Sequence, residues 1–337
     1  MKALVTGGGG FLGRAIIEQL LARGDQVRSF ARGTYPDLSA RGVDVVQGDV
    51  ANSDAVVRAV AGCEVVFHVA AKAGLWGHPS DFFNANVAGT DNVIRACRQS
   101  GVARLVYTSS PSVVFNGRDM EGADESVPYA RAYHAEYPRT KALAEQRLLA
   151  ANSQTLATIA LRPHLLWGPH DTQLTKSILA RGRSGTLARI GARDPLVDFT
   201  YVDNAALAHI LAAEKLAAGA PISGRPFFVT QGEPVPLWTF VNRLLEAGSI
   251  PPVQRTISPR IAYGAGALLE LAYRVLPLKG EPRLTRFLVE ELCTAHWFDI
   301  AAARRELGYE PFVSIEEGLL RLRASLATPR NLSLHNL

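Results

Sequence analysis

Cysteine is scarce in this 337-residue chain, and its placement excludes several kinds of site. The three residues Cys63, Cys97 and Cys293 lie far apart, and their odd number and spacing match neither a disulfide framework nor a metal-binding motif. We therefore expect reduced thiols, a cytoplasmic location and no metal site.

Long apolar runs and clusters of one charge are also missing. The best candidate for a membrane segment, 261–269, has nine uncharged residues between Arg260 and Glu270, whereas a spanning helix needs about 20. No membrane span is expected there, and peripheral contact with a membrane or a lipid-like substrate stays open. The 36 basic and 31 acidic residues are scattered, which argues against nucleic acid as a partner. The amino terminus has the pattern of a strand broken by glycines, and we do not expect a signal peptide.

Two kinds of apolar pattern alternate along the first half of the chain. Nearly continuous runs of strand length alternate with segments of helical spacing. The expected strands are 2–6, 26–31, 43–47, 64–69, 103–109 and 156–162, and the expected helices are 11–22, 53–60, 81–100 and 133–151. This alternation predicts an α/β fold of the Rossmann type, with a doubly wound parallel sheet covered on both faces.

The pattern changes after Pro163, where prolines become frequent and segments shorter. We expect residues 1–170 to form a dinucleotide-binding domain, to which 199–230 returns as strand 199–202, helix 203–217 and strand 226–230. Residues 171–198 and 231–325 would form a smaller, mostly helical substrate-binding part over the strand ends, and 326–337 would be a tail.

A glycine-rich turn joins the first expected strand to the first expected helix. Gly7, Gly10 and Gly13 have the spacing of a dinucleotide fingerprint in the strand–turn–helix context that it requires. Gly7 permits the tight turn, Gly10 lets the backbone approach a pyrophosphate, and Gly13 lets the helix pack on the strand. Phe11 and Leu12 open that helix, whose amino terminus would face the phosphates.

The second strand lacks the acidic residue that an NAD site places at its end, and Arg32 stands there instead. An arginine can hold a 2′-phosphate in a fork, so Arg32 favours NADP(H), with NAD(H) as the alternative. At other strand ends, Asp49 and Val50 would meet the adenine, and the small residues Ala70 and Ala71 would leave room for the adenosine.

Ser110, Tyr137 and Lys141 form the candidate catalytic group. Tyr137 and Lys141 are four residues apart on an expected helix and therefore share one face. The lysine ammonium and a nicotinamide cation would favour the phenolate, and Lys141 would also bind the nicotinamide ribose. Ser110, with Ser109 as its competitor, would hold the substrate oxygen, which predicts proton transfer beside a hydride carrier. Asn86 either bends its helix and holds a water of this relay or has a structural role only.

Taken together, these motifs resemble the extended short-chain dehydrogenases/reductases, and within them the 3β-hydroxysteroid and sterol-4-carboxylate dehydrogenase branch. The resemblance covers nearly the whole chain and is carried by Tyr107-Thr108-Ser109-Ser110, Tyr137-Pro138-x-Thr140-Lys141-Ala142-x-Ala144-Glu145, Leu161-Arg162-Pro163, Tyr201-Val202-Asp203-Asn204, Glu281-Pro282-x-Leu284-Thr285-Arg286, Phe298-Asp299-Ile300 and Ala303-Arg304-x-x-Leu307-Gly308-Tyr309-x-Pro311. It implies that Ser110, three residues before Val113, is the catalytic serine, and that Pro163 contacts the cofactor.

A closer resemblance is to the bacterial 2-alkyl-3-ketoalkanoate reductases of olefin biosynthesis. It is carried by Phe30-Ala31-Arg32-Gly33-x-Tyr35-Pro36-x-Leu38 and Ala70-Ala71-Lys72-Ala73-Gly74-x-Trp76-Gly77. It implies NADPH-dependent reduction of a long-chain 2-alkyl-3-keto acid to the 3-hydroxy acid, alongside other enzymes of the same pathway. Family members dimerise through the helices corresponding to 81–100 and 133–151, which implies a homodimer.

A long apolar pocket for a hydrophobic small molecule would then be lined or covered by Trp76, His134 and a helix at 261–276. His164, just after the sixth strand, either faces the nicotinamide or substrate carboxylate or is structural. The alternative activity is that of a 3β-hydroxysteroid or sterol-4-carboxylate 3-dehydrogenase. Two further alternatives are weaker. A binding protein that only senses the cofactor would not need Tyr137 and Lys141. A nucleotide-sugar epimerase would need groups that bind a uridine and a pyrophosphate, and we do not identify them.

Overall fold

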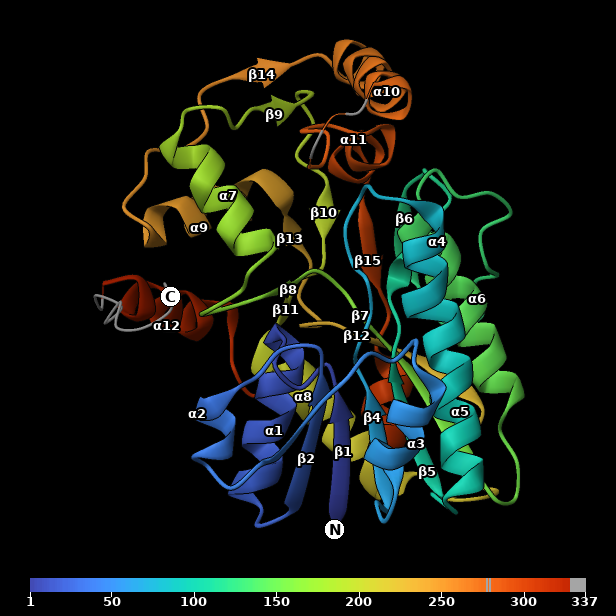
Figure 1. Ribbon diagram of the computed structural model, residues 1–337. Helices are drawn as coiled ribbons and strands as arrows, with labels where there is room; N and C mark the ends of the chain where they lie inside the picture. The colour runs from blue at the N-terminus through green and yellow to red at the C-terminus, as the bar shows by residue number, and fades with distance from the viewer. Residues whose placement is uncertain (277, 279, 328–337) are drawn as a thin grey trace.

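The computed structural model describes residues 1–276, 278 and 280–327, and its centre is a seven-stranded sheet (Figure 1). The strands lie in the order β12–β7–β5–β4–β1–β2–β3, and every pair within the sheet is parallel. They are β1 (Lys2–Thr6), β2 (Gln26–Ala31), β3 (Asp44–Gln47), β4 (Val65–His68), β5 (Arg104–Thr108), β7 (Ala157–Pro163) and β12 (Arg225–Val229). The order reverses between β1 and β4, which confirms the predicted Rossmann-type fold and opens a crevice at the carboxyl ends of the strands.

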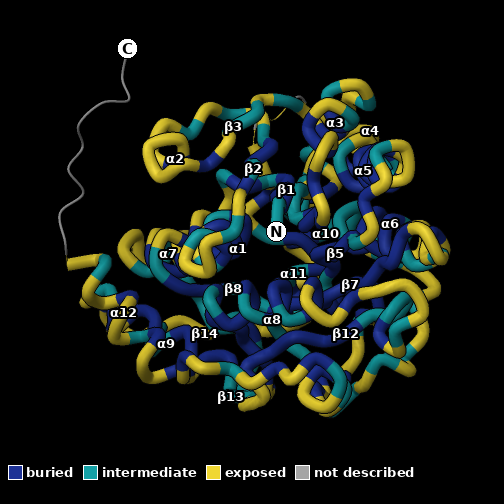
Figure 2. The backbone as a smooth tube through the Cα atoms, turned by 90° about the horizontal axis from the view of Figure 1, so that it is seen from below, coloured by how far each residue is buried: buried dark blue, intermediate teal, exposed yellow. Residues whose placement is uncertain are grey.

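Alternation along the strands explains why helices cover both faces. In β1, Val5 packs into one core cluster and Leu4 into the other, because successive side chains of a strand point to opposite faces. The first cluster includes α1 (Phe11–Ala22) and α8 (Val202–Lys215), and the second includes α3 (Ser53–Val60), α5 (Gly89–Gln99) and α6 (Glu136–Ala150). Burial accordingly follows the strands, whereas α2 (Pro36–Ser39) and α12 (Ile315–Ala327) expose most of their residues (Figure 2).

A second group of elements lies above the carboxyl ends of the strands (Figure 1). Its helices are α7 (Leu174–Arg183), α9 (Leu237–Ala247), α10 (Pro259–Val275) and α11 (Arg286–Cys293). Short strands connect it: β9 (Arg189–Ile190) pairs with β14 (Thr256–Ile257), and β13 (Val235–Pro236), β10 (Leu196–Val197), β15 (His296–Phe298) and β6 (Met120–Ala123) form a four-stranded sheet. This group supplies the upper wall of the crevice.

Two predicted elements differ from the structure. The predicted strand 199–202 is wrong as a member of the main sheet, because β11 (Thr200–Tyr201) pairs with β8 (Leu166–Trp167) in a separate two-stranded sheet. The predicted helix 133–151 begins only at Glu136, since Tyr133 leaves the helix and donates its hydroxyl to the Val113 carbonyl at 2.8 Å. Of the predicted tail, residues 326 and 327 belong to α12, and the rest lies outside the described residues.

The predicted helix 81–100 is interrupted at Asn86. It consists of α4 (Pro79–Phe82), π-helical turns over Phe83–Ala88, and α5. The Asn86 side chain accepts from the Lys72 backbone N–H at 2.7 Å and donates to the Lys72 carbonyl and the Thr140 hydroxyl, each at 3.0 Å. The predicted bend is therefore present, and the amide of Asn86 is used to hold the loop after β4.

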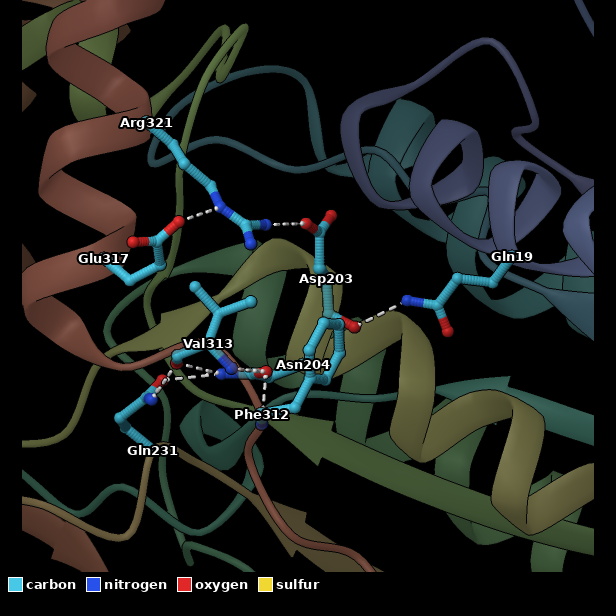
Figure 3. Close-up of polar contacts among 8 residues, drawn as sticks. All are labelled: Gln19, Asp203, Asn204, Gln231, Phe312, Val313, Glu317 and Arg321. Atoms are coloured by element: carbon cyan, nitrogen blue, oxygen red, sulfur yellow. Dashed lines mark hydrogen bonds and ion pairs between the residues drawn. The ribbon is translucent and has the colours of Figure 1, made fainter.

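The Asn204 amide anchors the carboxyl-terminal segment to the sheet domain (Figure 3). Its oxygen accepts from the backbone N–H groups of Phe312 and Val313 at 3.0 Å, and its nitrogen donates to the Val313 carbonyl at 2.8 Å. One residue earlier, the Asp203 carbonyl accepts from Gln19 of α1 at 2.8 Å. The start of α8 thus connects α1 with the chain leading into α12.

Candidate active site

Every residue predicted to bind the cofactor or to act in catalysis lines one cavity of about 1740 Å³. The cavity lies at the carboxyl ends of the strands, where the strand order reverses, and extends under α7, α9 and α11. The set comprises Gly7, Gly10, Phe11, Leu12, Gly13, Arg32, Asp49, Val50, Ala70, Ala71, Ser110, Tyr137, Lys141 and Pro163.

The glycine turn brings backbone segments too close together for a side chain at Gly7 or Gly13. Gly7 has a φ of +70°, and a Cβ there would lie 3.0 Å from the Ala70 backbone. A Cβ on Gly13 would come within 2.3 Å of the Gly7 carbonyl oxygen. Helix α1 has no acidic residue in its first turn, and Gly10 offers no capping side chain. Its amino-terminal N–H groups are therefore suited to an anionic group, so this cradle fits a dinucleotide pyrophosphate.

Arg32 lies exposed at the edge of this cavity, just beyond β2. No ion pair involves its side chain within the described part of the chain, whereas the nearby Asp37 pairs with Arg14. The ring of Tyr35 lies against Gly9, where a Cβ would overlap it, and the Arg14 guanidinium stands 5.4 Å from the ring centre. The wall made by Tyr35 was missed by the sequence analysis, because a glycine does not indicate which side chain covers it.

Lys141 is buried beneath the substrate side of the cavity. Its ammonium donates to the Thr108 carbonyl at 2.5 Å and lies 4.1 Å from the centre of the Tyr107 ring. Burial lowers the pKa of Lys141 to about 7, and Glu145 opposes this shift. The lysine is therefore fixed to the end of β5, one helical turn from Tyr137.

Burial sets the direction in which the pKa of Tyr137 is shifted in the structure. Burial raises its pKa above the usual value, a hydrogen bond with Ser110 works in the opposite direction, and the charge of Glu291 adds to the increase. Burial therefore dominates the pKa of Tyr137 here, and the Lys141 ammonium is bonded to the Thr108 carbonyl. That Lys141 and a nicotinamide cation together favour the phenolate stays a prediction.

The structure favours Ser110 over Ser109. The hydroxyl of Ser110 accepts from the Ser112 backbone N–H at 3.2 Å and from the Ser112 hydroxyl at 2.9 Å, and Ser110 lowers the pKa of Tyr137. The hydroxyl of Ser109 is buried and lacks a hydrogen-bond partner within the described residues. Of the two serines, Ser110 is the one that affects the pKa of Tyr137.

Two residues predicted for the substrate pocket lie outside its wall. Trp76 packs edge-on against Tyr273 of α10 at 6.2 Å, and His134 pairs with Glu290 at 2.9 Å. Neither lines the cavity, and α10 contributes only Ala262 to it. The large apolar side chains of α10 point outward instead: Ile261, Leu268, Leu271 and Val275 are each more than half exposed. Within the described ranges, no helix is long and apolar enough to cross a bilayer.

The upper wall contains groups that the sequence analysis did not assign to catalysis. His164 and Glu291 both line the cavity, as does His296 of β15, whose ring bonds His164 at 3.2 Å. Glu291 is one of two adjacent acidic residues in α11, and the sequence carries no signal that separates it from Glu290.

The sequence matches the 3-beta hydroxysteroid dehydrogenase/isomerase family over residues 4–259. It is 53% identical over 330 residues to a 2-alkyl-3-oxoalkanoate reductase of Stenotrophomonas maltophilia, covering 97% of this chain and all of that protein. It is 36% identical to a decarboxylating sterol-4-alpha-carboxylate 3-dehydrogenase of Mus musculus, covering 95% of this chain and 89% of that protein. The fold is similar to that of Thermus thermophilus UDP-glucose 4-epimerase in complex with NAD, with a TM-score of 0.74, 24% identity and coverage of 97% and 99%.

The resemblance stated from the motifs is thereby confirmed. The extent of the family match, the near full-length identity to dehydrogenases and reductases, and the shared cavity of Ser110, Tyr137 and the glycine turn all agree. The chain belongs to the 3-beta hydroxysteroid dehydrogenase/isomerase family and is an oxidoreductase.

Proposed function

We propose that this protein reduces a long-chain 2-alkyl-3-keto acid to the 3-hydroxy acid with NADPH. The observation that carries the proposal is that Ser110, Tyr137 and Lys141 line one cavity together with the glycine turn and apolar side chains. Those apolar residues are Leu187, Ile190, Phe199, Trp238, Val241, Ile257, Leu284, Phe287, Leu288, Leu292 and Phe298. Two relatives of 53% and 48% identity bear the name of this reductase.

The chemistry needs one hydride at the carbonyl carbon and one proton at its oxygen. A bound nicotinamide cofactor would supply the hydride. Tyr137 would donate the proton, and its raised pKa keeps it protonated near neutral pH, as reduction requires. Ser110 would hold the same oxygen through its hydroxyl, and Lys141 would bind the cofactor ribose from the end of β5.

The preference for NADPH is assigned to Arg32. We expect Arg32→Ala to raise the KM for NADPH roughly 10- to 150-fold, which corresponds to the 1.5–3 kcal/mol of a hydrogen bond to a charged group. The KM for NADH should change little, because only the 2′-phosphate needs the guanidinium. Initial rates with each cofactor measure both constants.

The control for this variant is Arg58→Ala, which removes an exposed arginine from α3 that does not line the cavity. It should leave both KM values unchanged. Equal increases for NADPH and NADH in Arg32→Ala would remove the 2′-phosphate assignment.

Chain length tests the substrate class. Because β-keto acids lose carbon dioxide spontaneously, we would follow the reverse reaction, oxidation of 2-alkyl-3-hydroxy acids with NADP⁺. We expect kcat/KM to rise roughly fourfold for each added methylene until the pocket is full, since burying a CH₂ contributes about 0.8 kcal/mol. A flat series, or a preference for a rigid 3β-hydroxysteroid over every acyl chain, would move the assignment to the sterol dehydrogenase alternative.

The proposal also covers the location of the protein and its assembly with itself and other partners. We propose a cytoplasmic homodimer formed through α5 and α6, which pack against each other and bear the Asp91–Arg147 ion pair on their outer side. We also propose that the protein associates with other enzymes of the pathway and contacts a membrane peripherally. The exposed apolar side chains of α10 support the membrane contact.

A further inference from the structure

Glu291 is an acidic residue on the substrate side of the cavity that the reaction above does not use. It lies on α11, over the carboxyl ends of the strands (Figure 1), and lines the same cavity as Ser110 and Tyr137. Both residues line this cavity, and the charge of Glu291 raises the pKa of Tyr137. Within the described residues, its carboxyl forms no hydrogen bond and no ion pair.

The neighbouring Glu290 has a different environment. Its carboxylate accepts from the His134 ring at 2.9 and 3.0 Å, and it does not line the cavity. Of two adjacent acids on one helix, only Glu291 therefore has its carboxyl free on the reaction side.

A chain of hydrogen bonds fixes the backbone that carries Glu291. The Nε2 atom of His296 lies 2.8 Å from the Glu291 carbonyl, which can only accept, so Nε2 carries the proton. Burial lowers the pKa of His296 and of His164, so both rings are neutral near pH 7. The Nδ1 atom of His296 then accepts from Nε2 of His164 at 3.2 Å. His164 directly follows β7, and Glu291 is thus tied to the end of the central sheet.

The charged and titratable groups around this carboxyl leave it without a cation. Tyr137 faces it from α6, Glu290 precedes it on α11, and His296 bonds its carbonyl from β15. The ammonium of Lys141 is directed to the Thr108 carbonyl. Burial, and then the charge of Glu290, raise the pKa of Glu291 to about 8, so the carboxyl is neutral at pH 7 and can donate a proton in a hydrogen bond.

We propose that Glu291 is the residue that recognises the substrate carboxylate, as a protonated carboxyl donating to it beside the reacting carbonyl. The proposal rests on the proposed reductase function. In a 3-keto acid the carboxylate stands two carbons from the carbonyl, so the group that binds it must line the same cavity as the tyrosine serving that carbonyl, as Glu291 does. A carboxyl and a carboxylate that share one proton form a short, strong hydrogen bond. A deprotonated Glu291 would place two like charges together and reject the acid, whereas a neutral ester would be unaffected.

The test compares a 2-alkyl-3-hydroxy acid with its methyl ester as substrates for oxidation with NADP⁺ from pH 6 to pH 10. Effects of pH on Tyr137 and on the cofactor are common to both compounds and cancel in the ratio of their kcat/KM values. For the wild-type protein, the acid-to-ester ratio should be constant below pH 8 and fall about tenfold per pH unit above it, because the protonated fraction of Glu291 falls at that rate. This measurement needs no variant and so does not depend on a variant folding.

Glu291→Gln keeps a neutral donor at every pH, and its acid-to-ester ratio should no longer change with pH. Glu290→Gln, on the same helix, should retain the fall but shift it to lower pH, because it removes a neighbouring negative charge. A wild-type ratio that is independent of pH, or a Glu291→Gln ratio that still falls above pH 8, would overturn the role of Glu291. If the wild-type protein oxidised neither compound, the proposed reductase function itself would fail, which is a distinguishable result.

Discussion

Tyr137→Phe should lower kcat for carbonyl reduction by roughly 10²–10⁴-fold, the range that a positioned proton donor contributes. The substitution keeps the ring and removes only the hydroxyl, which lines the cavity side of Tyr137 and would protonate the carbonyl oxygen. Cofactor affinity should change little, because the ribose contact is assigned to Lys141. Loss of NADPH absorbance measures the rate, and fluorescence titration with NADPH measures the affinity.

Tyr133→Phe is the matched control, four residues earlier in the chain. The Tyr133 hydroxyl bonds the Val113 carbonyl at 2.8 Å, and Tyr133 does not line the cavity, so this variant should keep most of the activity. Near wild-type turnover in Tyr137→Phe would contradict its role as proton donor and favour a cofactor-binding protein without this chemistry.

The largest effect on stability is expected at the ion pair of Glu145 on α6 and Arg162 on β7. Both side chains are almost fully buried, and the guanidinium contacts the carboxylate at 2.5, 3.1 and 3.2 Å. The Tyr129 hydroxyl donates to the same carboxylate at 2.7 Å. Glu145→Gln leaves the arginine charge buried without its partner, and we expect it to lower the free energy of unfolding by about 3–5 kcal/mol. Denaturant titration measures this change.

An exposed ion pair provides the comparison. Glu317 and Arg321 are one turn apart on α12 with an N–O distance of 2.8 Å, and Glu317→Gln should cost less than about 1 kcal/mol. The double substitution Glu145→Leu with Arg162→Met should recover much of the loss, because neither charge then remains in the core. If Glu145→Gln were as stable as the wild-type protein, the buried pair would not hold α6 to the sheet.

The sequence predicted best those strands and helices that are long enough to show their own apolar pattern. The bounds of β1, α1, β2 and α3 agree with those expected, because an apolar run bounded by glycine or a polar cap defines each of them. The pairing of β11 with β8 was not predictable in this way. Each strand has two residues, too few to show a periodicity, and tertiary packing decides their partner.

The candidate site also contains both residues that the sequence indicates and residues that only the fold brings together. Ser110, Tyr137 and Lys141 could be named because their spacing along the chain carries the chemistry. Glu291 comes more than 150 residues after Tyr137 and lines the same cavity only through the folding of α11 over the sheet. Glu145 and Arg162 were noted as members of motifs, but no spacing rule indicated that they bind each other.

The position of β12 has a consequence for synthesis of the protein on the ribosome. Strand β12 covers the edge of β7, and α8 packs on α1, yet both elements come after residue 200. A nascent chain that has emerged only as far as β7 therefore presents an unpaired strand edge and the uncovered apolar side of α1. Such surfaces favour association with other chains, and they stay uncovered until β12, which begins 62 residues after the end of β7, has been translated.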